Sequence, residues 1–362
     1  MEEIKPMKNK PLDGKRILVT GGTGSLGHVL VRRLLTSEMG QPKKIIVFSR
    51  DEAKQHAMRI EYLHRIAPTD EVIYNNFKQL LEFRIGDVRN FHSIASALRD
   101  ADVVFNAAAL KQVPACEYFP YEAVQTNISG PENIIRTIRE HRLPIETVVG
   151  ISTDKACKPV NVMGMTKAIQ ERVFIRANID CPDTRFVCVR YGNVLASRGS
   201  VIPLFLEQIR NNGPVTITTP DMTRFLLSLN QAVDTIFEAI QHAKPGETYI
   251  PRAPAAKVAD IASVLIDKRP IKTVVTGIRP GEKIHEIMIS EEECYRTVER
   301  GNYYAILPML PELRDKDDII TPLDEEFSSA NDLISMGELK GLLSEQKLLL
   351  KDNPDGEEEL LR

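Results

Sequence analysis

The first half of the chain alternates between short apolar runs and longer stretches with helical periodicity. The candidate strands are RILVT (16–20), KIIVF (44–48), LEFRI (81–85), DVVFN (102–106), ETVVGIS (146–152) and RFVCVRY (185–191). Apolar residues at helical spacing lie between them, over residues 24–35, 51–65, 91–98 and 117–141. Nearly continuous apolar strands separated by helices are typical of a parallel sheet with both faces covered. The pattern therefore predicts an α/β fold built on a doubly wound parallel sheet.

After Tyr191 the alternation of strand-like and helical stretches becomes irregular, and prolines separate shorter elements. This texture predicts a second, smaller α/β domain, and a length of 362 residues also favours two domains. We expect residues 1–191, with about 226–252, to form the first domain, and residues 192–225 and 253–362 the second. From about Ser328 the chain has a helical pattern, and it ends in the acidic tail DNPDGEEELLR.

Composition narrows the range of partners. The 47 basic and 50 acidic side chains leave a net charge of -3, which gives no reason to expect a nucleic acid or an anionic membrane as a partner. No apolar run approaches the ~18 residues of a spanning helix, and the polar N-terminus lacks the apolar core of a signal peptide. We therefore expect a soluble cytoplasmic protein. The five cysteines show no CxxC spacing and the histidines are scattered, so the sequence predicts reduced thiols and no metal site.

The first candidate strand runs into TGGTGSLG, in which Gly21, Gly24 and Gly27 follow a GxxGxxG spacing. Gly21 permits the tight turn out of the strand, Gly24 lets the backbone approach a pyrophosphate, and Gly27 lets the next helix pack close to the sheet. The N-terminus of that helix offers free N–H groups and a partial positive charge to a phosphate. This arrangement predicts a dinucleotide site of the Rossmann type. The other residues expected to line this loop are Thr23, Ser25 and Leu26.

The end of the second strand, FSRDEAK, bears on the choice between NADP and NAD. Ser49 and Arg50 come first, and a guanidinium can form bidentate bonds to a 2′-phosphate, so we expect NADP. Asp51 follows and is suited to accept ribose hydroxyls, which keeps NAD open as the cofactor.

Further cofactor contacts are expected after the third and fourth strands. Asp87 and Val88 follow the third strand, where the adenine is usually read. In NAAALKQVP, after the fourth strand, Lys111 is in position to reach a phosphate or ribose. Asn127 lies in an expected helix and would brace the neighbouring strand. Small side chains that would let the backbone press against the cofactor stand at Ala107, Ala108 and Ala109.

The stretch STDKACKPVNVMGMTK, residues 152–167, carries the candidate chemistry. Asp154 and Lys155 directly follow a strand, so they lie at its carboxyl end, where ligands of open α/β sheets bind. Met163 stands four residues before Lys167, and a thioether cannot move a proton. The residues alone leave two readings open, an acid–base pair or a surface ion pair.

Taken together, TGGTGSLG, AAALKQVP, TNISG, STDKA, the MxxxK pair and RYGNVLASRGSVIP resemble extended short-chain dehydrogenase/reductases. More narrowly, they are similar to the UDP-N-acetylglucosamine 4,6-dehydratases of polysaccharide biosynthesis. The resemblance runs from about residue 15 to residue 311. The segments MTRF, RAPA and RPGEK..E look closest to the short soluble branch that inverts carbon 5. Methionine at the position of the usual tyrosine recurs within this family.

The resemblance implies a sequence of steps and a role for each residue. Carbon 4 of the sugar gives a hydride to the nicotinamide, Lys155 takes the proton from carbon 5, Asp154 protonates the departing carbon 6 hydroxyl, and the hydride returns to carbon 6. For Lys155 to act near neutral pH its pKa must fall, and Lys167, which would also bind the nicotinamide ribose, is the candidate cation for this. Thr153 is placed to bond the carbon 4 hydroxyl. We expect Asp154 to take that proton in place of the tyrosine, directly or through water, with Met163 filling space beside the sugar.

The resemblance also implies a UDP-N-acetylhexosamine substrate whose diphosphate is clamped by the second domain. RYGNV begins this domain, with Tyr191 expected at the cofactor and Asn193 at both ligands. SRGSVIP supplies a helix start at Ser200 that can bind phosphate as the first one does. The residues expected at the substrate are Lys111, Asn193, Ser197, Arg198, Ser200, Val201, Arg224, Arg279 and Glu282.

Two other functions stay open. A UDP-hexose 4-epimerase or reductase of the same fold would return the hydride to carbon 4, has no need of the adjacent acid and lysine, and generally keeps the tyrosine. A non-catalytic nucleotide-sugar-binding protein would bind without turnover. The resemblance implies self-association into dimers or higher rings and leaves the configuration at carbon 5 of the product open.

Overall fold

A nine-stranded sheet organises the described residues of the computed structural model, which are residues 10–63, 76–195, 200–314 and 322–350. Its strands are β1 (Arg16–Thr20), β2 (Lys44–Ser49), β3 (Leu81–Ile85), β4 (Val103–Asn106), β5 (Thr147–Ile151), β6 (Arg185–Val189), β9 (Thr248–Pro251), β13 (Thr297–Arg300) and β14 (Tyr303–Ile306). Their order is β13-β14-β9-β6-β5-β4-β1-β2-β3. The first six strands and β9 run parallel, whereas β14 pairs antiparallel with β9 and β13 with β14.

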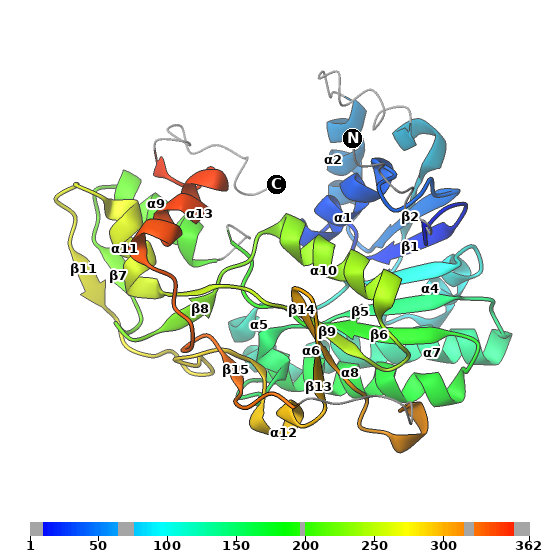
Figure 1. Ribbon diagram of the computed structural model, residues 1–362. Coiled ribbons are helices and arrows are strands. Elements are labelled where there is room, and N and C mark those ends of the chain that lie inside the picture. Colours follow the sequence, from blue (N-terminus) through cyan, green and yellow to red (C-terminus); the bar gives the residue numbers. More distant parts are fainter. Residues whose placement is uncertain (1–9, 64–75, 196–199, 315–321, 351–362) are drawn as a thin grey trace, which may run out of the picture.

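Helices cover both faces of this sheet (Figure 1). They are α1 (Ser25–Leu35), α2 (Glu52–Leu63), α4 (Phe91–Leu98), α5 (Val113–Tyr118), α6 (Pro120–Val124), α7 (Gly130–His141), α8 (Val162–Asp180) and α10 (Leu229–His242). Successive side chains of a strand point to opposite faces. In β1, Ile17 and Val19 join α1, α2 and α10 in one apolar cluster, while Leu18 joins α4, α7 and α8 in the other. The predicted doubly wound α/β sheet is thereby confirmed.

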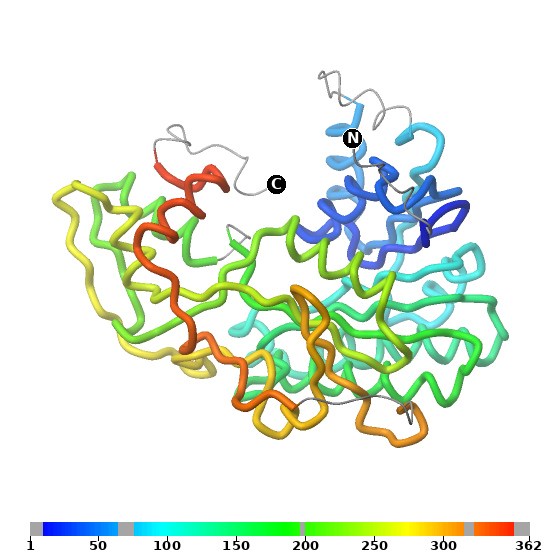
Figure 2. Tube along the Cα trace, viewed as in Figure 1, coloured from blue at the N-terminus to red at the C-terminus, as the bar shows by residue number. Residues whose placement is uncertain are grey.

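A smaller lobe stands at the left of Figure 1. Its elements and those that join it to the sheet are α9 (Val201–Arg210), β7 (Val215–Ile217), β8 (Thr223–Phe225), β10 (Ala255–Lys257), α11 (Val258–Ile266), β11 (Thr273–Val275), β12 (Ile287–Ile289), α12 (Glu291–Cys294), β15 (Phe327–Ser328) and α13 (Met336–Glu345). Short strand pairs form between β8 and β10, β7 and β11, and β12 and β15. Phe205, Leu265 and Leu339 lie in the core of this lobe. Figure 2 shows the last helix, in red, returning to pack in this lobe.

The six expected strands agree with the structure to within two residues at each end. The single helix expected over residues 117–141 is interrupted at Phe119, where the backbone leaves the helical region, and it contains a π-helical turn. The chain instead forms the end of α5, then α6, a π-helical turn over Gln125–Ser129, and α7. Pro120 and Pro131 stand in the first turns of α6 and α7, because proline has no N–H to donate to a preceding turn and therefore favours helix starts.

The C-terminal part also differs from expectation. Ser328 ends strand β15, and the helix begins only at Met336, where Ser335 and Glu338 form a capping box. The acidic tail lies outside the described residues. Strands β13 and β14 fall in the range 253–362 that was expected in the second domain, yet they extend the large sheet, because β14 pairs with the edge of β9. Within the described ranges, no helix is long and apolar enough to cross a membrane.

Candidate active site

The glycine loop between β1 and α1 has the geometry that its spacing predicts. Gly21 adopts a φ of 67°, and a β-carbon there would stand 2.7 Å from the backbone nitrogen of Ala108, so the loop after β4 can approach only a glycine. A β-carbon on Gly27 would lie 2.5 Å from the α-carbon of Gly22. Gly24 is the exposed N-cap of α1, and no side chain among the described residues caps that end. The first N–H groups of α1 are therefore open to an anion. Half-buried or exposed residues flank them, namely Thr23, Ser25 and Leu26.

The residues after β2 and β3 come together at the same edge of the sheet. The guanidinium of Arg50 is 61% exposed and lies 4.0 Å from the carboxylate of Asp87. The carboxylate of Asp51 caps the start of α2, because it accepts a hydrogen bond from the backbone nitrogen of Lys54 at 3.0 Å. Ser49 accepts a bond from the amide of Gln55 at 3.1 Å. Val88, by contrast, is a buried core residue.

Asn127 braces the loop that follows β4. Its Oδ1 accepts from the backbone nitrogen of Leu110 at 2.8 Å, and its Nδ2 donates to the Leu110 carbonyl and to Thr166 Oγ1, both at 3.0 Å. The buried Asn127 therefore joins this loop to α8. The part of the loop that stays accessible comprises half-buried Ala107 and Ala108 and exposed Ala109 and Lys111.

Asp154 opens a 3₁₀ turn (Asp154–Ala156) at the carboxyl end of β5. Its side chain is fully buried, and its Oδ1 accepts hydrogen bonds from Thr153 Oγ1 at 2.7 Å and from Lys155 Nζ at 3.1 Å. Oδ2 is buried and has no hydrogen-bond partner among the described residues. A β-carbon at Gly192 would stand 3.5 Å from that oxygen. Among the described residues, the turn therefore holds a carboxyl group with one oxygen that accepts two hydrogen bonds and one that accepts none.

Lys155 is surrounded by three oxygen acceptors. Its Nζ donates to Asn193 Oδ1 at 2.9 Å as well as to Asp154, and it lies 3.2 Å from Glu286 Oε1. Burial lowers the pKa of Lys155, but the carboxylates of Asp154 and Glu286 outweigh burial and leave it above its ordinary value. The expectation that this pKa falls is therefore wrong. Arg224 is the cation that opposes the rise, and not Lys167 as expected.

Lys167 and Met163 lie on the first turns of α8. The helix starts after Asn161, whose Oδ1 accepts from the backbone nitrogen of Gly164 at 2.8 Å. Met163 is buried in a small apolar cluster that includes Cys116 of α5. Lys167 is buried and donates to the carbonyl oxygen of Ile151 and to Gln170 Oε1, and burial lowers its pKa to about 8.

The expected substrate residues fall into two groups. Ser200 is the N-cap of α9 and Val201 its first residue, as predicted, whereas Ser197 and Arg198 lie outside the described residues. Arg224 faces the protein, since its guanidinium donates to the carbonyl oxygens of residues 223, 283 and 284.

In the turn of residues 279–283, Glu282 Oε2 accepts from the backbone nitrogen of Arg279 at 3.4 Å, and Arg279 itself is exposed. Two further residues of this region belong to the RPGEK..E segment but were not among the residues expected at the substrate. Lys283 donates to the carbonyl oxygen of Cys157 at 2.6 Å, and Glu286 contacts Lys155. Glu286 is the last residue of RPGEK..E, and membership of that segment is the sequence signal that could have found it.

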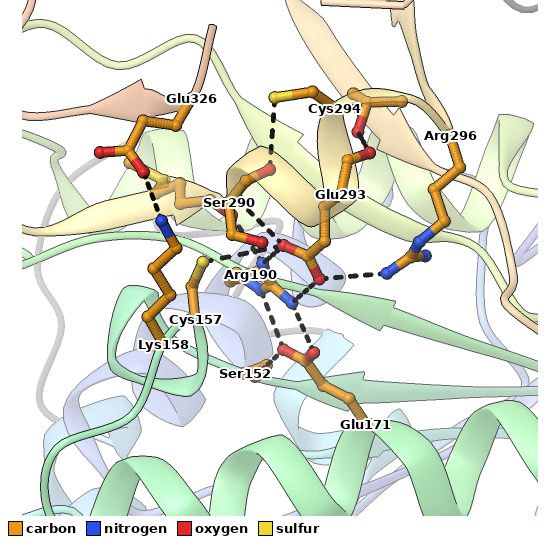
Figure 3. A network of polar contacts seen from close by, with 12 residues as sticks. Ser152, Cys157, Lys158, Glu171, Arg190, Ser290, Glu293, Cys294, Arg296 and Glu326 are labelled. Atoms are coloured by element: carbon orange, nitrogen blue, oxygen red, sulfur yellow. Dashed lines mark hydrogen bonds and ion pairs between the residues drawn. The ribbon is translucent and has the colours of Figure 1, made fainter.

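A buried ion network joins the end of β6 to α8 and α12 (Figure 3). Arg190, directly after β6, bonds Glu171 of α8 at 2.7 Å and Glu293 of α12 at 2.8 Å. Burial lowers the pKa of Arg190, but the two carboxylates raise it well above its ordinary value. For Glu293, burial raises the pKa but Arg190 outweighs it and brings the value to about 2. The network thus fixes α12, and with it the segment that carries Glu286, against the large sheet.

Comparisons with known proteins identify the family of this chain. A family model described as "Polysaccharide biosynthesis protein" matches residues 17–308. A protein of Rickettsia bellii (strain OSU 85-389) named UDP-glucose 4-epimerase is 44% identical over 297 residues, which cover 81% of this chain and 82% of the relative.

Solved structures show the same fold. The X-ray structure of Pen from Bacillus thuringiensis superposes with a TM-score of 0.82 and 34% identity, over 93% of this chain and 99% of Pen. The dTDP-glucose 4,6-dehydratase DesIV from Streptomyces venezuelae, solved with NAD and TYD bound, gives a TM-score of 0.60 at 20% identity, over 74% of this chain and 86% of its own. The chain therefore belongs to the polysaccharide biosynthesis protein family, among the nucleotide-sugar-modifying enzymes with the extended short-chain dehydrogenase/reductase fold.

Proposed function

We propose that the protein is a UDP-N-acetylglucosamine 4,6-dehydratase that inverts carbon 5. The observation that carries this proposal is the ion pair between buried Asp154 and half-buried Lys155 at the carboxyl end of β5, with methionine at position 163. Water elimination needs an acid for the leaving hydroxyl and a base for the carbon 5 proton, and this pair supplies both within one turn.

The position of Thr153 supports a route for the carbon 4 hydroxyl proton, which a tyrosine would otherwise remove. A hydroxyl donates one hydrogen bond and still accepts others. Thr153 Oγ1 donates a hydrogen bond to Asp154 Oδ1, so a lone pair on Oγ1 remains to accept a hydrogen bond from a substrate hydroxyl. A proton leaving the carbon 4 hydroxyl then has a path through Thr153 to Asp154, which later delivers a proton to the carbon 6 oxygen. Oδ2 of Asp154, which is buried and has no hydrogen-bond partner in the described part of the chain, gives the same carboxyl group a second oxygen that can exchange a proton with the sugar.

The chain's residues fit a nicotinamide dinucleotide. The open N-terminus of α1 suits the pyrophosphate, and exposed Ala109 and Lys111 lie at the next strand end. When bound, such a cofactor takes a hydride from carbon 4 and supplies it to carbon 6. We infer NADP, because Arg50 is exposed while the Asp51 carboxylate is engaged by the start of α2. Binding titrations of both cofactors test this, since Arg50→Ala should weaken NADP selectively.

The second candidate is a UDP-hexose 4-epimerase, which the name of the Rickettsia bellii relative favours. An epimerase removes and returns hydrogen at carbon 4 and eliminates nothing. The two candidates therefore differ in product mass and in the fate of the carbon 5 proton.

One experiment separates them. Purified protein is incubated with UDP-N-acetylglucosamine in deuterated water, and the product is followed by proton NMR and mass spectrometry. A dehydratase gives a 4-keto-6-deoxy sugar that has lost water and carries deuterium at carbon 5, and coupling constants report the ring configuration. A product of unchanged formula with inverted carbon 4 would identify the epimerase. Binding without turnover would reject the dehydratase, and a repeat with UDP-glucose then tests the epimerase.

A further inference from the structure

Glu286 makes a contact that the proposed chemistry does not use. Its carboxylate is 2% exposed, and Oε1 lies 3.2 Å from Lys155 Nζ and 3.7 Å from Arg224 Nε. Its Oε2 is buried without a hydrogen-bond partner in the described ranges. A buried carboxylate with half its acceptors unused is costly to keep unless its charge has a task.

The position of Glu286 is fixed by its own backbone. Its nitrogen donates to Ser329 Oγ at 2.9 Å, and its carbonyl oxygen accepts from the nitrogen of Ser329 at 2.8 Å. Ser329 Oγ in turn lies 2.7 Å from Thr223 Oγ1 on β8. The carboxylate therefore reaches Lys155 from a rigid strand pair that is separate in sequence from the turn after β5.

The contact completes the coordination of Lys155. An ammonium group has three N–H donors, and Asp154, Asn193 and Glu286 place three oxygens within 3.2 Å of this one. A neutral amine would have only two N–H donors and would leave one of these oxygens facing a lone pair. The geometry thus selects the charged form.

We propose that Glu286 is a positioning residue that holds Lys155 as an ammonium and so sets the pH above which the amine can act as a base. This inference rests on the proposed function for its catalytic meaning. The charged groups that face Lys155 are Asp154 on its own turn, Glu286 before β12, Arg224 on β8 and Lys283 in the 279–283 turn. Glu286 is the only one of the two carboxylates that comes from another part of the chain, so it couples Lys155 to the small lobe.

The test compares Glu286→Gln with wild type by titrating Lys155 directly. Acylation of Lys155 by an amine reagent is measured against pH and quantified by peptide mass spectrometry. Glutamine keeps an oxygen acceptor and removes the charge, so the midpoint of Lys155 reactivity should fall by about one pH unit or more, a change of roughly tenfold in the amine fraction. Glu286→Asp keeps the charge on a shorter side chain and should restore most of the shift. Glu291→Gln, a neighbouring carboxylate that is 75% exposed, is the control and should leave the midpoint unchanged.

The pH dependence of dehydration gives the second readout. Glu286→Gln should move the acid limb of the rate profile to lower pH, so that the variant outpaces wild type several-fold on that limb. A residue with only a structural role would lower the rate at every pH and leave the midpoint in place, which would overturn the inference. If the Lys155 midpoint shifts while neither protein dehydrates the sugar, the inference holds and the proposed function fails. If both proteins dehydrate the sugar normally and the Lys155 midpoint does not move, the proposed function holds and the inference fails.

Discussion

The carbonyl oxygen of Lys155 occupies the space in which a β-carbon of residue 164 would stand. Gly164 lies in the first turn of α8, where its backbone nitrogen bonds the side chain of Asn161. Asn161 Nδ2 also donates to the carbonyl oxygen of Gly281 at 2.8 Å. The start of α8 therefore sets the backbone position of the Asp154–Lys155 turn and the turn of residues 279–283 together.

Gly164→Ala should displace the turn and lose activity along with stability. The added methyl meets rigid backbone, so we expect a destabilisation of ~1–3 kcal/mol and a large loss of turnover. Gly341→Ala is the matched control, because that helical position in α13 has open space around it and alanine should be neutral or stabilising by up to ~1 kcal/mol. Urea unfolding and turnover of both variants provide the measurement. Wild-type activity in Gly164→Ala would show that the turn tolerates movement.

Asp154→Asn should stop hydride transfer, because asparagine cannot take the proton that Thr153 passes on. We expect single-turnover formation of reduced cofactor to slow by about 10²–10⁴-fold. The absorbance of the reduced nicotinamide after mixing with substrate measures this rate. Asp183→Asn, which changes an exposed carboxylate in the turn before β6, should behave as wild type. Undiminished reduction of the cofactor in Asp154→Asn would assign the proton acceptor elsewhere.

Lys167→Met should stabilise the protein while weakening cofactor binding. Burial lowers the pKa of Lys167 to about 8, below the ordinary 10.5, so the unfolded chain binds more protons between these values. Wild-type stability should therefore rise as pH increases from about 8 to 10.5, and the burial cost of up to ~3 kcal/mol is present at neutral pH. Methionine removes this cost, and Gln170 still donates to the carbonyl oxygen of Ile151 at 3.0 Å.

Urea unfolding of Lys167→Met at neutral and alkaline pH measures this effect. The variant should be more stable than wild type at neutral pH and should lack the alkaline gain. Lys268→Met, at an exposed position, is the control. A variant that is less stable than wild type at neutral pH would contradict the burial argument.

Glu293→Gln should flatten the acid branch of the stability curve. The folded pKa of Glu293 is about 2 against an ordinary 4.5, so the ionised carboxylate contributes stability above pH 4.5 that is lost as pH falls toward 2. The contribution is up to about 3 kcal/mol, and its loss in the variant should make stability less dependent on pH in this window. Chemical unfolding between these limits measures the slope, with the exposed Glu207→Gln as reference. Equal slopes in wild type and Glu293→Gln would show that ionisation of Glu293 does not contribute to stability.

The fold could be predicted because its strands are apolar runs and its phosphate loop has glycines at fixed spacing. Local signals also placed the starts of α1 and α9. The interruption before Pro120 and the π-helical turn before Pro131 both coincide with prolines in the sequence, but the helical periodicity continued across them.

Lys155 shows where sequence reasoning stops. Its pKa depends on Glu286 and Arg224, which pack against it from distant parts of the chain. Spacing along the chain carries no information about such contacts. The same holds for the pairing of β14 with β9, because the chain between these two strands runs through the smaller lobe.

The pairing of β14 with β9 has a consequence for biosynthesis. On the ribosome, β9 emerges long before Tyr303, and its outer hydrogen-bonding edge has no strand to meet until residues 303–306 leave the exit tunnel. Arg190 waits in the same way for Glu293. A nascent or truncated polypeptide that stops short of these residues presents an open β-edge beside an Arg190 that has Glu171 but lacks its second carboxylate, which makes it a target for aggregation and for quality control.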